Sequence, residues 1–125
     1  ICRPDLVVAC VVSYAVTDLH DLARVDYRFE AHYTERLVGP LPECEDRYRE
    51  RSPITHASSL RVPTLMFHGD ADPVVPIAQM RAFAAATGGA VQTVEFAGEG
   101  HGWSRSVGEE VQARTVRFLG ERFDA

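Results

Sequence analysis

Three apolar runs, separated by polar or helix-like stretches, are the features that most constrain the fold of this chain. They are Leu6–Tyr14 (LVVACVVSY), Thr64–Phe67 (TLMF) and Val91–Phe96 (VQTVEF). Short continuous runs of this kind, rich in β-branched and aromatic residues, are typical of strands that are buried on both faces. The sequence therefore predicts three strands of one buried sheet.

Two helix patterns follow the second and third of these runs. The first covers Ile77–Thr87, is rich in alanine and begins after Pro76, a residue that suits the start of a helix; the second extends from about Ser106 to Phe123. Their apolar faces comprise Ile77, Met80 and Ala84 in the first helix and Val107, Val111, Thr115, Phe118 and Leu119 in the second. Alternation of strands and helices predicts an α/β fold with a mainly parallel sheet and right-handed crossovers.

The segment from Asp18 to Pro53 interrupts this alternation, being polar, aromatic and rich in charges of both signs. We expect two or three short helices here, separated at Gly39-Pro40 and at Pro42. The segment can form a solvated face, or its aromatic residues can line one side of a cleft. These aromatic residues are Tyr27, Phe29, Tyr33 and Tyr48.

Length and charge limit the classes of function. A chain of 125 residues forms one domain at most, and its net charge of −5 argues against nucleic acid as a partner, because phosphate binding needs a basic surface. The longest apolar run, Leu6–Val12, is too short to cross a bilayer. Because the chain starts at Ile1, a few residues before a predicted strand, we expect it to be part of a longer polypeptide.

Cysteine and histidine spacing indicates neither a disulfide framework nor a metal site. The three cysteines are odd in number and lack redox or metal-ligand spacing, which favours a reducing, cytoplasmic compartment, although any targeting signal would lie upstream. We expect no cofactor and no metal. The histidines without ligand-like partners at metal spacing are His20, His32 and His56.

The connections after the second and third predicted strands carry the candidate catalytic residues. HGDADPVVP, residues 68–76, joins a strand to a helix, and so does AGEGHGW, residues 97–103. The carboxyl ends of adjacent parallel strands meet at one edge of a sheet, which is where ligands and catalytic groups collect. The sequence thus predicts that Asp72 and His101, 29 residues apart, lie within reach of one another.

A carboxylate beside a histidine is suited to proton transfer. An imidazole titrates near neutral pH, and a buried carboxylate on one ring nitrogen fixes the tautomer and stabilises the imidazolium, so that the other nitrogen can face a nucleophile. Glycines on both sides of His101 fit this role, since a side chain at Gly100 or Gly102 could obstruct the approach.

Each residue also has a simpler interpretation. A histidine such as His101 in a loop is commonly a surface residue. Asp72, which precedes a proline, can simply be a turn residue or a residue at the N-terminus of a helix. Asp70 is an alternative acid in the same loop, and His68 at the end of a strand is expected to be structural. The joint pattern, strand–HGxxDxxVP–helix followed by strand–GxGHG–helix, is more specific than its parts.

The chain resembles the end of an α/β-hydrolase domain in RVPTLMFHGDADPVVP and VEFAGEGHGW. FEAHYTERLVGPLPE and YRERSPITHA narrow the resemblance to the prolyl oligopeptidase family of serine peptidases, especially its acylaminoacyl-peptidase-like and dipeptidyl-peptidase-like members. The resemblance implies that Asp72 is the acid and His101 the histidine of a Ser-Asp-His triad acting on peptide substrates. It also implies that the three predicted strands are the last of an eight-stranded sheet.

The chain departs from this family pattern at the nucleophile. In this fold the serine precedes the acid and the histidine, within Gly-x-Ser-x-Gly, and the 125 residues contain no such motif. We therefore expect residues 1–125 to be the C-terminal half of a catalytic domain that lacks the nucleophile-elbow half, and to be inactive alone. The partners we expect are the missing half of the domain and, through an exposed strand edge, further copies of the chain.

Two other interpretations remain open at this point. The loops alone also fit another α/β-hydrolase, such as a carboxylesterase or a relative of dienelactone hydrolase. A non-catalytic remnant or interaction module is the third interpretation, and it predicts that Asp72 and His101 are not hydrogen-bonded.

Overall fold

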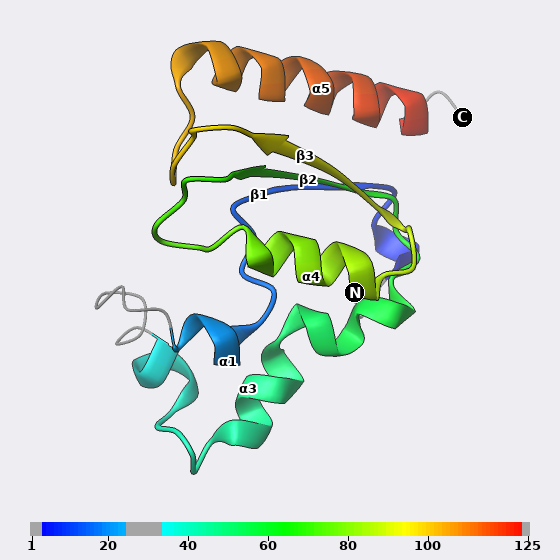
Figure 1. Cartoon of the computed structure of the whole chain (residues 1–125). Coiled ribbons are helices and arrows are strands. Elements are labelled where there is room, and N and C mark those ends of the chain that lie inside the picture. Colours follow the sequence, from blue (N-terminus) through cyan, green and yellow to red (C-terminus); the bar gives the residue numbers. More distant parts are fainter. Residues whose placement is uncertain (1–3, 25–33, 124–125) are drawn as a thin grey trace.

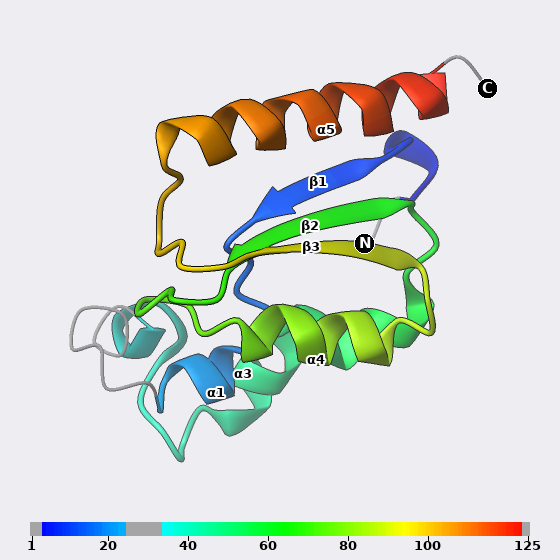
Figure 2. The ribbon, with the colours of Figure 1, turned by 45° about the horizontal axis from the view of Figure 1, so that its top comes forward.

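An open, three-stranded parallel sheet with helices on both faces forms the fold (Figures 1 and 2). This is a computed structural model that describes residues 4–24 and 34–123. The strands are β1 (Cys10–Ser13), β2 (Thr64–Gly69) and β3 (Val91–Phe96), and they lie in the order β1-β2-β3. The predicted α/β class with parallel strands is confirmed.

The register brings the ends of neighbouring strands together at one edge of the sheet. Cys10 of β1 is paired with Thr64 of β2, and Gly69 at the end of β2 is paired with Phe96 at the end of β3. All pairings are parallel, so the segments that leave the carboxyl ends of the strands emerge on the same side.

Only the central strand has the double-sided burial predicted for all three. Every residue of β2 is buried, whereas β1 is half-buried and three residues of β3 face solvent, because each of these strands has a single neighbour among the described residues. The first strand is also shorter than predicted. Residues 6–8 precede the pairing with β2 and are exposed, and Leu6 belongs to a 3-10 turn, Pro4–Leu6.

One hydrophobic core lies on each face of the sheet. The helix α4 (Ala78–Ala86) and the 3-10 helix η2 (Pro53–Ser59) cover one face, and α5 (Arg105–Phe123) covers the other (Figure 1). The buried residues on the α4 side are Ala57, Leu60, Val62, Met66, Met80 and Phe83, and those on the α5 side are Leu65, Phe67, Phe96 and Phe118. The apolar faces predicted for both helices therefore point to the sheet.

The inserted segment forms short helices, as predicted. They are α1 (Leu19–Leu22), a helical stretch at residues 34–38 and α3 (Glu45–Arg51). In Figure 2 they lie on the side of α4 that faces away from the sheet. Asp18 starts α1, because its carboxylate accepts hydrogen bonds from the backbone N–H groups of the first turn.

A buried glutamine ties this insertion to α4. The Gln79 side-chain oxygen accepts from the backbone N–H groups of Thr17 (2.9 Å) and Asp18 (2.7 Å). Its amide nitrogen donates to the Asp18 carbonyl (3.0 Å) and to Asp21 Oδ2 (3.1 Å). The start of the insertion is thus fixed relative to the helix that follows the acid loop.

Tyr48 does not line a cleft. It is 1% exposed, and its hydroxyl donates to the Gly39 carbonyl at 3.0 Å, so it belongs to the packing of the insertion. The other three aromatic residues considered for a cleft, Tyr27, Phe29 and Tyr33, lie outside the described residues.

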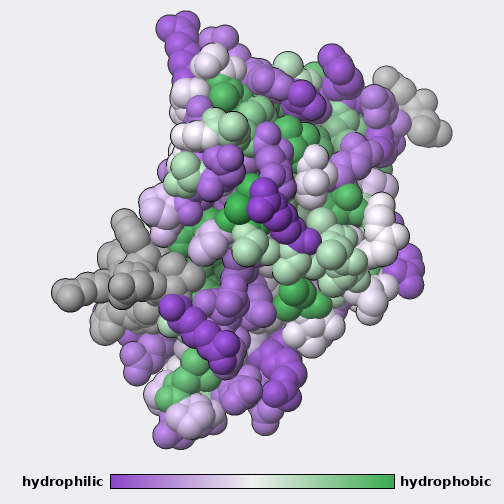
Figure 3. Space-filling model, viewed as in Figure 1, coloured by the Kyte–Doolittle hydropathy of each residue, from purple (hydrophilic) through white to green (hydrophobic). Residues whose placement is uncertain are grey.

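The face shown in Figure 3 carries mainly polar side chains over the outer side of α5, with apolar side chains in separate patches nearer the middle. Across the part of the chain that the structure describes, no helix has the length and apolar character needed to cross a membrane.

Candidate active site

The two loops predicted to carry catalytic residues leave the sheet on the same side. Figure 2 shows that the β2–α4 and β3–α5 connections both begin at the carboxyl edge of the sheet. Their backbones touch, because the Ala71 N–H donates to the Glu99 carbonyl at 3.0 Å, and the Asp70 N–H donates to the Phe96 carbonyl at 3.1 Å. Adjacent parallel strands thus place the acid loop against the histidine loop.

Asp72 and His101 form a direct hydrogen bond. His101 Nδ1 lies 2.9 Å from Asp72 Oδ2, which makes Nδ1–H the donor when Asp72 is ionised. The Asp72 side chain is fully buried, whereas 40% of the His101 side chain is exposed. Within the described residues no hydrogen bond involves Nε2 of His101, so this nitrogen is free to accept a proton from an incoming group.

The second oxygen of Asp72 holds the carboxylate in place. Oδ1 accepts hydrogen bonds from the backbone N–H groups of Val74 (2.8 Å) and Val75 (3.0 Å). Burial alone raises the pKa of the Asp72 carboxyl, but the bonds from Val75, His101 and Val74 together outweigh burial, and the pKa lies below its ordinary value of 3.8. Asp72 is therefore ionised at neutral pH and oriented toward His101.

Close contact between the loops requires a glycine at the end of β2. A Cβ built on Gly69 would collide with the carbonyl of Glu99. On the other side of the histidine loop, the Glu99 carboxylate accepts from both the N–H and the hydroxyl of Ser104, each at 2.7 Å. Gly69 thus allows the loop that carries His101 to lie against the end of β2, and the Glu99 side chain links the two ends of that loop.

The glycines beside His101 are not crowded by the described residues. A Cβ on Gly100 would have only an ordinary contact with the Ala71 carbonyl at 3.9 Å, and one on Gly102 would meet nothing within 4 Å. Gly102 instead has φ 153°, a backbone conformation that L side chains rarely adopt. That a side chain at Gly100 or Gly102 would obstruct the approach of a nucleophile to His101 stays a prediction.

The alternative acid has another partner, whereas the second histidine lies beside Asp72. Asp70 is exposed, and its carboxylate accepts from the Gly98 N–H at 2.7 Å. His68 is fully buried, its Nε2 donates to the Val75 carbonyl at 2.7 Å, and the same nitrogen lies 3.4 Å from Asp72 Oδ2. His68 thus supports the turn that holds Asp72, which agrees with the structural role predicted for it.

Two aromatic residues beside the pair were missed by sequence reasoning. The Tyr14 ring lies 4.8 Å from the His101 ring and 4.4 Å from that of Trp103, centroid to centroid. Burial, together with the negative charges of Asp72 and Glu99, raises the pKa of Tyr14 to about 12. Trp103 directly follows the Gly-His-Gly motif, and this neighbourhood could have identified it from the sequence. Nothing near Tyr14 in the sequence indicated that its ring lies beside His101.

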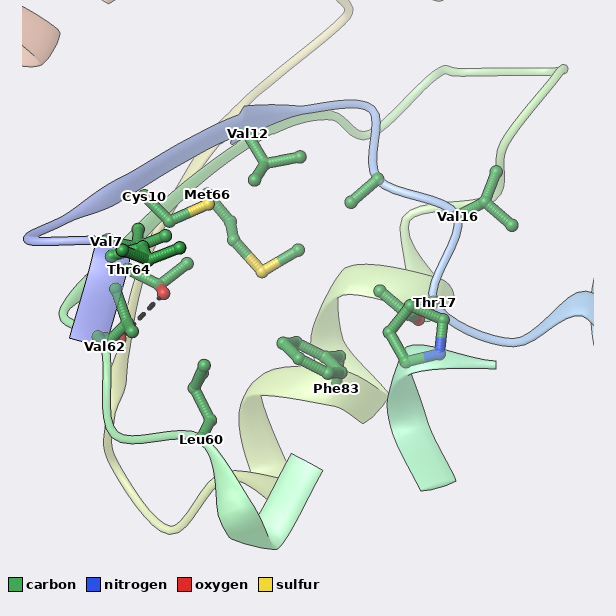
Figure 4. A pocket seen from close by; sticks show the side chains of 13 residues that line it. Val7, Cys10, Val12, Val16, Thr17, Leu60, Val62, Thr64, Met66 and Phe83 are labelled. Atoms are coloured by element: carbon green, nitrogen blue, oxygen red, sulfur yellow. Dashed lines mark hydrogen bonds between the residues drawn. The ribbon is translucent and has the colours of Figure 1, made fainter. Parts of the chain in front are cut away.

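An apolar cavity lies away from this pair. It has a volume of about 580 Å³ and lies between the sheet and α4, where Val12, Met66 and Phe83 point into it (Figure 4). Its lining is almost entirely apolar and includes neither Asp72 nor His101. Such a space beside the edge strand β1 is suited to packing against apolar side chains.

Among residues 4–24 and 34–123 there is no cluster of three or more histidine, cysteine, aspartate or glutamate side chains that could hold a metal ion.

Comparison with known proteins agrees with this geometry. The model of the prolyl oligopeptidase family matches residues 3–125. The chain belongs to the prolyl oligopeptidase family. Asp72 and His101 both lie within the matched region, and the three strands with their flanking helices are part of an α/β-hydrolase fold.

Several known proteins are similar to the chain. A puromycin hydrolase, solved as its S511A mutant complexed with PGG, is 38% identical with a TM-score of 0.74, and the match covers 86% of this chain and 16% of that one. A puromycin-hydrolyzing peptidase of Mycobacterium tuberculosis is 36% identical with a TM-score of 0.71, over 76% of this chain and 15% of that one. The acylamino-acid-releasing enzyme of Arabidopsis thaliana is 38% identical over 63 residues, 50% of this chain and 8% of that protein.

The chain spans less than a fifth of the length of each of these three relatives.

Proposed function

We propose that Asp72 and His101 are the acid and the base of a Ser-Asp-His triad in a serine peptidase that hydrolyses peptide or aminoacyl amide bonds. The observation that carries this proposal is the 2.9 Å contact between Asp72 Oδ2 and His101 Nδ1, with Asp72 Oδ1 held by two backbone N–H groups. Membership of the prolyl oligopeptidase family supports it. A non-catalytic module would have no need for a buried, ionised carboxylate directed at an exposed imidazole.

In this mechanism His101 Nε2 accepts the proton of the serine hydroxyl as the oxygen attacks the carbonyl carbon of the substrate. Asp72 keeps the Nδ1 proton in place and stabilises the imidazolium that forms. His101 then gives its proton to the leaving amine, and an acyl-enzyme remains. A water molecule, deprotonated in turn by His101, hydrolyses this ester and regenerates the serine.

The serine and the oxyanion donors are supplied, in this proposal, by a nucleophile-elbow half outside residues 1–125. No Gly-x-Ser-x-Gly motif occurs in the chain, and the hydroxyl of Ser104, three residues from His101, is bound to Glu99. Residues 1–125 would then be the partial catalytic domain that contains the acid and the base.

That second half would also cover the apolar surface beside β1. Leu6, Val7 and Val8 are 68%, 46% and 55% exposed, and the 580 Å³ cavity opens beside the same strand. A neighbouring strand and an apolar helix would bury both features. Without them the exposed edge would promote association between copies of the chain.

The test is hydrolysis of chromogenic substrates by the 125-residue chain, alone and together with the nucleophile-containing half of a close relative such as the puromycin hydrolase. The panel comprises aminoacyl, dipeptidyl and acyl-aminoacyl p-nitroanilides, and puromycin. We expect no turnover by the chain alone, since loss of the nucleophile costs roughly 10⁶-fold in kcat, and turnover when the halves are co-expressed. Asp72→Asn and His101→Ala in the 125-residue half are the matched controls.

Turnover by the chain alone would contradict the proposed division of the triad. A reconstituted complex, verified by co-purification, that is active with His101→Ala would contradict the proposed base.

A further inference from the structure

Tyr14 lies directly after β1, with its ring against the loop that carries His101. The ring planes of Tyr14 and His101 are inclined by 45°, with centroids 4.8 Å apart. We infer that Tyr14 is a positioning residue, which holds the His101 imidazole in the orientation that proton transfer requires. The inference deepens the proposed function and rests on it for its catalytic consequence, but the geometry can be tested separately.

Tyr14 is itself braced by a series of aromatic rings that leads into the core. Its ring stacks on Trp103 at 4.4 Å and 30°, and Trp103 meets Phe96 edge-on at 5.3 Å and 66°. Phe96 in turn lies 6.2 Å from Phe67 at the centre of the sheet. Contacts between aromatic rings favour specific ring orientations. The packing of Phe67, Phe96 and Trp103 therefore helps to fix the position of the Tyr14 ring.

The backbone of Tyr14 is in an unusual conformation. Its φ is 55°, the left-handed region that non-glycine residues seldom adopt, and no other non-glycine residue in the described part of the chain has a positive φ. The Tyr14 N–H still donates to the Phe67 carbonyl at 3.2 Å, so the residue remains attached to β2 as the chain turns. Such conformations concentrate at functional sites, where the surrounding structure maintains them.

His101 needs a second constraint besides Asp72. A single hydrogen bond at Nδ1 fixes the distance to Asp72 but allows the ring to tilt about that bond, and 40% of the side chain is exposed. The ring of Tyr14 restricts this tilt on one side. The buried hydroxyl of Tyr14 makes no hydrogen bond of ordinary length and angle among the described residues, although the backbone of Gly102 lies near enough to act against the rise in its pKa. The ring is therefore the part that we take to position His101, and Tyr14→Phe tests the hydroxyl.

The experiment compares Tyr14→Phe with Tyr14→Asn in the reconstituted complex described above. Phenylalanine keeps the ring and removes the hydroxyl. Asparagine tolerates the left-handed backbone and removes the ring, so it separates the effect of the ring from that of the turn. Tyr48→Phe is the matched control, because it removes a buried tyrosine hydroxyl that is bound to Gly39 in the insertion.

Two readouts are needed. The first is the NMR signal of the His101 Nδ1 proton, assigned by its loss in Asp72→Asn, which reports the hydrogen bond without any catalysis. The second is the division of the effect between kcat and KM. Tyr14→Asn should broaden or abolish the proton signal and lower kcat roughly 10- to 100-fold with little change in KM, since misplacement of about 1 Å can cost 10²-fold. Tyr14→Phe and Tyr48→Phe should leave both readouts close to those of the unsubstituted protein.

A folded Tyr14→Asn protein with an unchanged proton signal and unchanged kcat would overturn the inference, and so would an equal loss in Tyr14→Phe. If Tyr14→Asn does not fold, Tyr14→Leu gives the same comparison, because leucine fills space without an aromatic face. If the unsubstituted complex has no activity, the proposed function fails, but the proton signal still decides whether Tyr14 positions His101.

Discussion

Replacing Asp72 by asparagine should separate the structural role of this residue from its chemical role, because its two oxygens have different partners. Oδ1 binds the N–H groups of Val74 and Val75, and Oδ2 binds His101. Asparagine can keep an acceptor at Oδ1. Its amide nitrogen, however, presents a donor to His101 Nδ1, which favours the tautomer with the proton on Nε2 and so removes the acceptor that a serine would need.

The expected magnitudes follow from these contacts. In Asp72→Asn, two charge-assisted hydrogen bonds become neutral ones, at a cost of about 1–2 kcal/mol in the free energy of unfolding, while activity falls about 10⁴-fold. In Asp72→Ala, the buried Val75 N–H loses its partner, at a cost of about 1–3 kcal/mol, and the half-buried Val74 N–H, which water can reach, adds about 1 kcal/mol. The alanine protein should thus be clearly less stable than the asparagine protein, with a similar loss of activity.

The measurement is urea unfolding together with p-nitroanilide hydrolysis, both on the domain reconstituted with its nucleophile half. Asp70→Asn is the control in the same loop, because it changes an exposed carboxylate that binds only the Gly98 N–H among the described residues, and it should cost less than about 1 kcal/mol with activity retained. The reasoning is refuted if Asp72→Asn keeps most of its activity, if it is as unstable as Asp72→Ala, or if Asp70→Asn causes the larger loss of activity.

Three further predictions concern stability. Because the pKa of Asp72 is lower in the folded state, its ionised form stabilises the fold above the ordinary value of 3.8, and this contribution is lost as the pH falls through the folded value. The difference in unfolding free energy between the unsubstituted protein and Asp72→Asn, measured by urea unfolding, should therefore be smaller below pH 3.8 than at about pH 5. Gly69→Ala should lower the unfolding free energy by about 1–3 kcal/mol, since a Cβ there collides with the Glu99 backbone, and a thermal melt with an unchanged midpoint would contradict this contact. Gly120→Ala, in α5 with open space around the new methyl group, should instead stabilise the protein by up to about 1 kcal/mol in the same melt, and a lower midpoint would show that the helix is packed differently there.

Sequence reasoning succeeded where the signal was local. The central strand, α4 and α5 follow from runs of apolar residues and from helical spacing. The approach of Asp72 to His101 follows from a topological rule, because loops after adjacent parallel strands emerge on one side of the sheet.

What sequence reasoning missed depends on contacts between distant segments. The length and burial of β1 depend on which strands lie beside it, and a run of apolar residues does not reveal its neighbours in the sheet. The conformation of Tyr14 and its stacking on Trp103 join residues that are far apart in the chain. The five hydrogen bonds made by the Gln79 side chain span about sixty residues and are equally invisible to local patterns.

The 2.9 Å contact between Asp72 and His101 connects residues only 29 positions apart, with both ends supported by β2 and β3. A cut in the polypeptide on the amino-terminal side of β1 therefore severs none of the bonds that assemble the proton-transfer pair. Under the proposed function, residues 1–125 would carry the base and its carboxylate as one unit, and the activity of an enzyme divided before β1 would report whether its two polypeptides have associated.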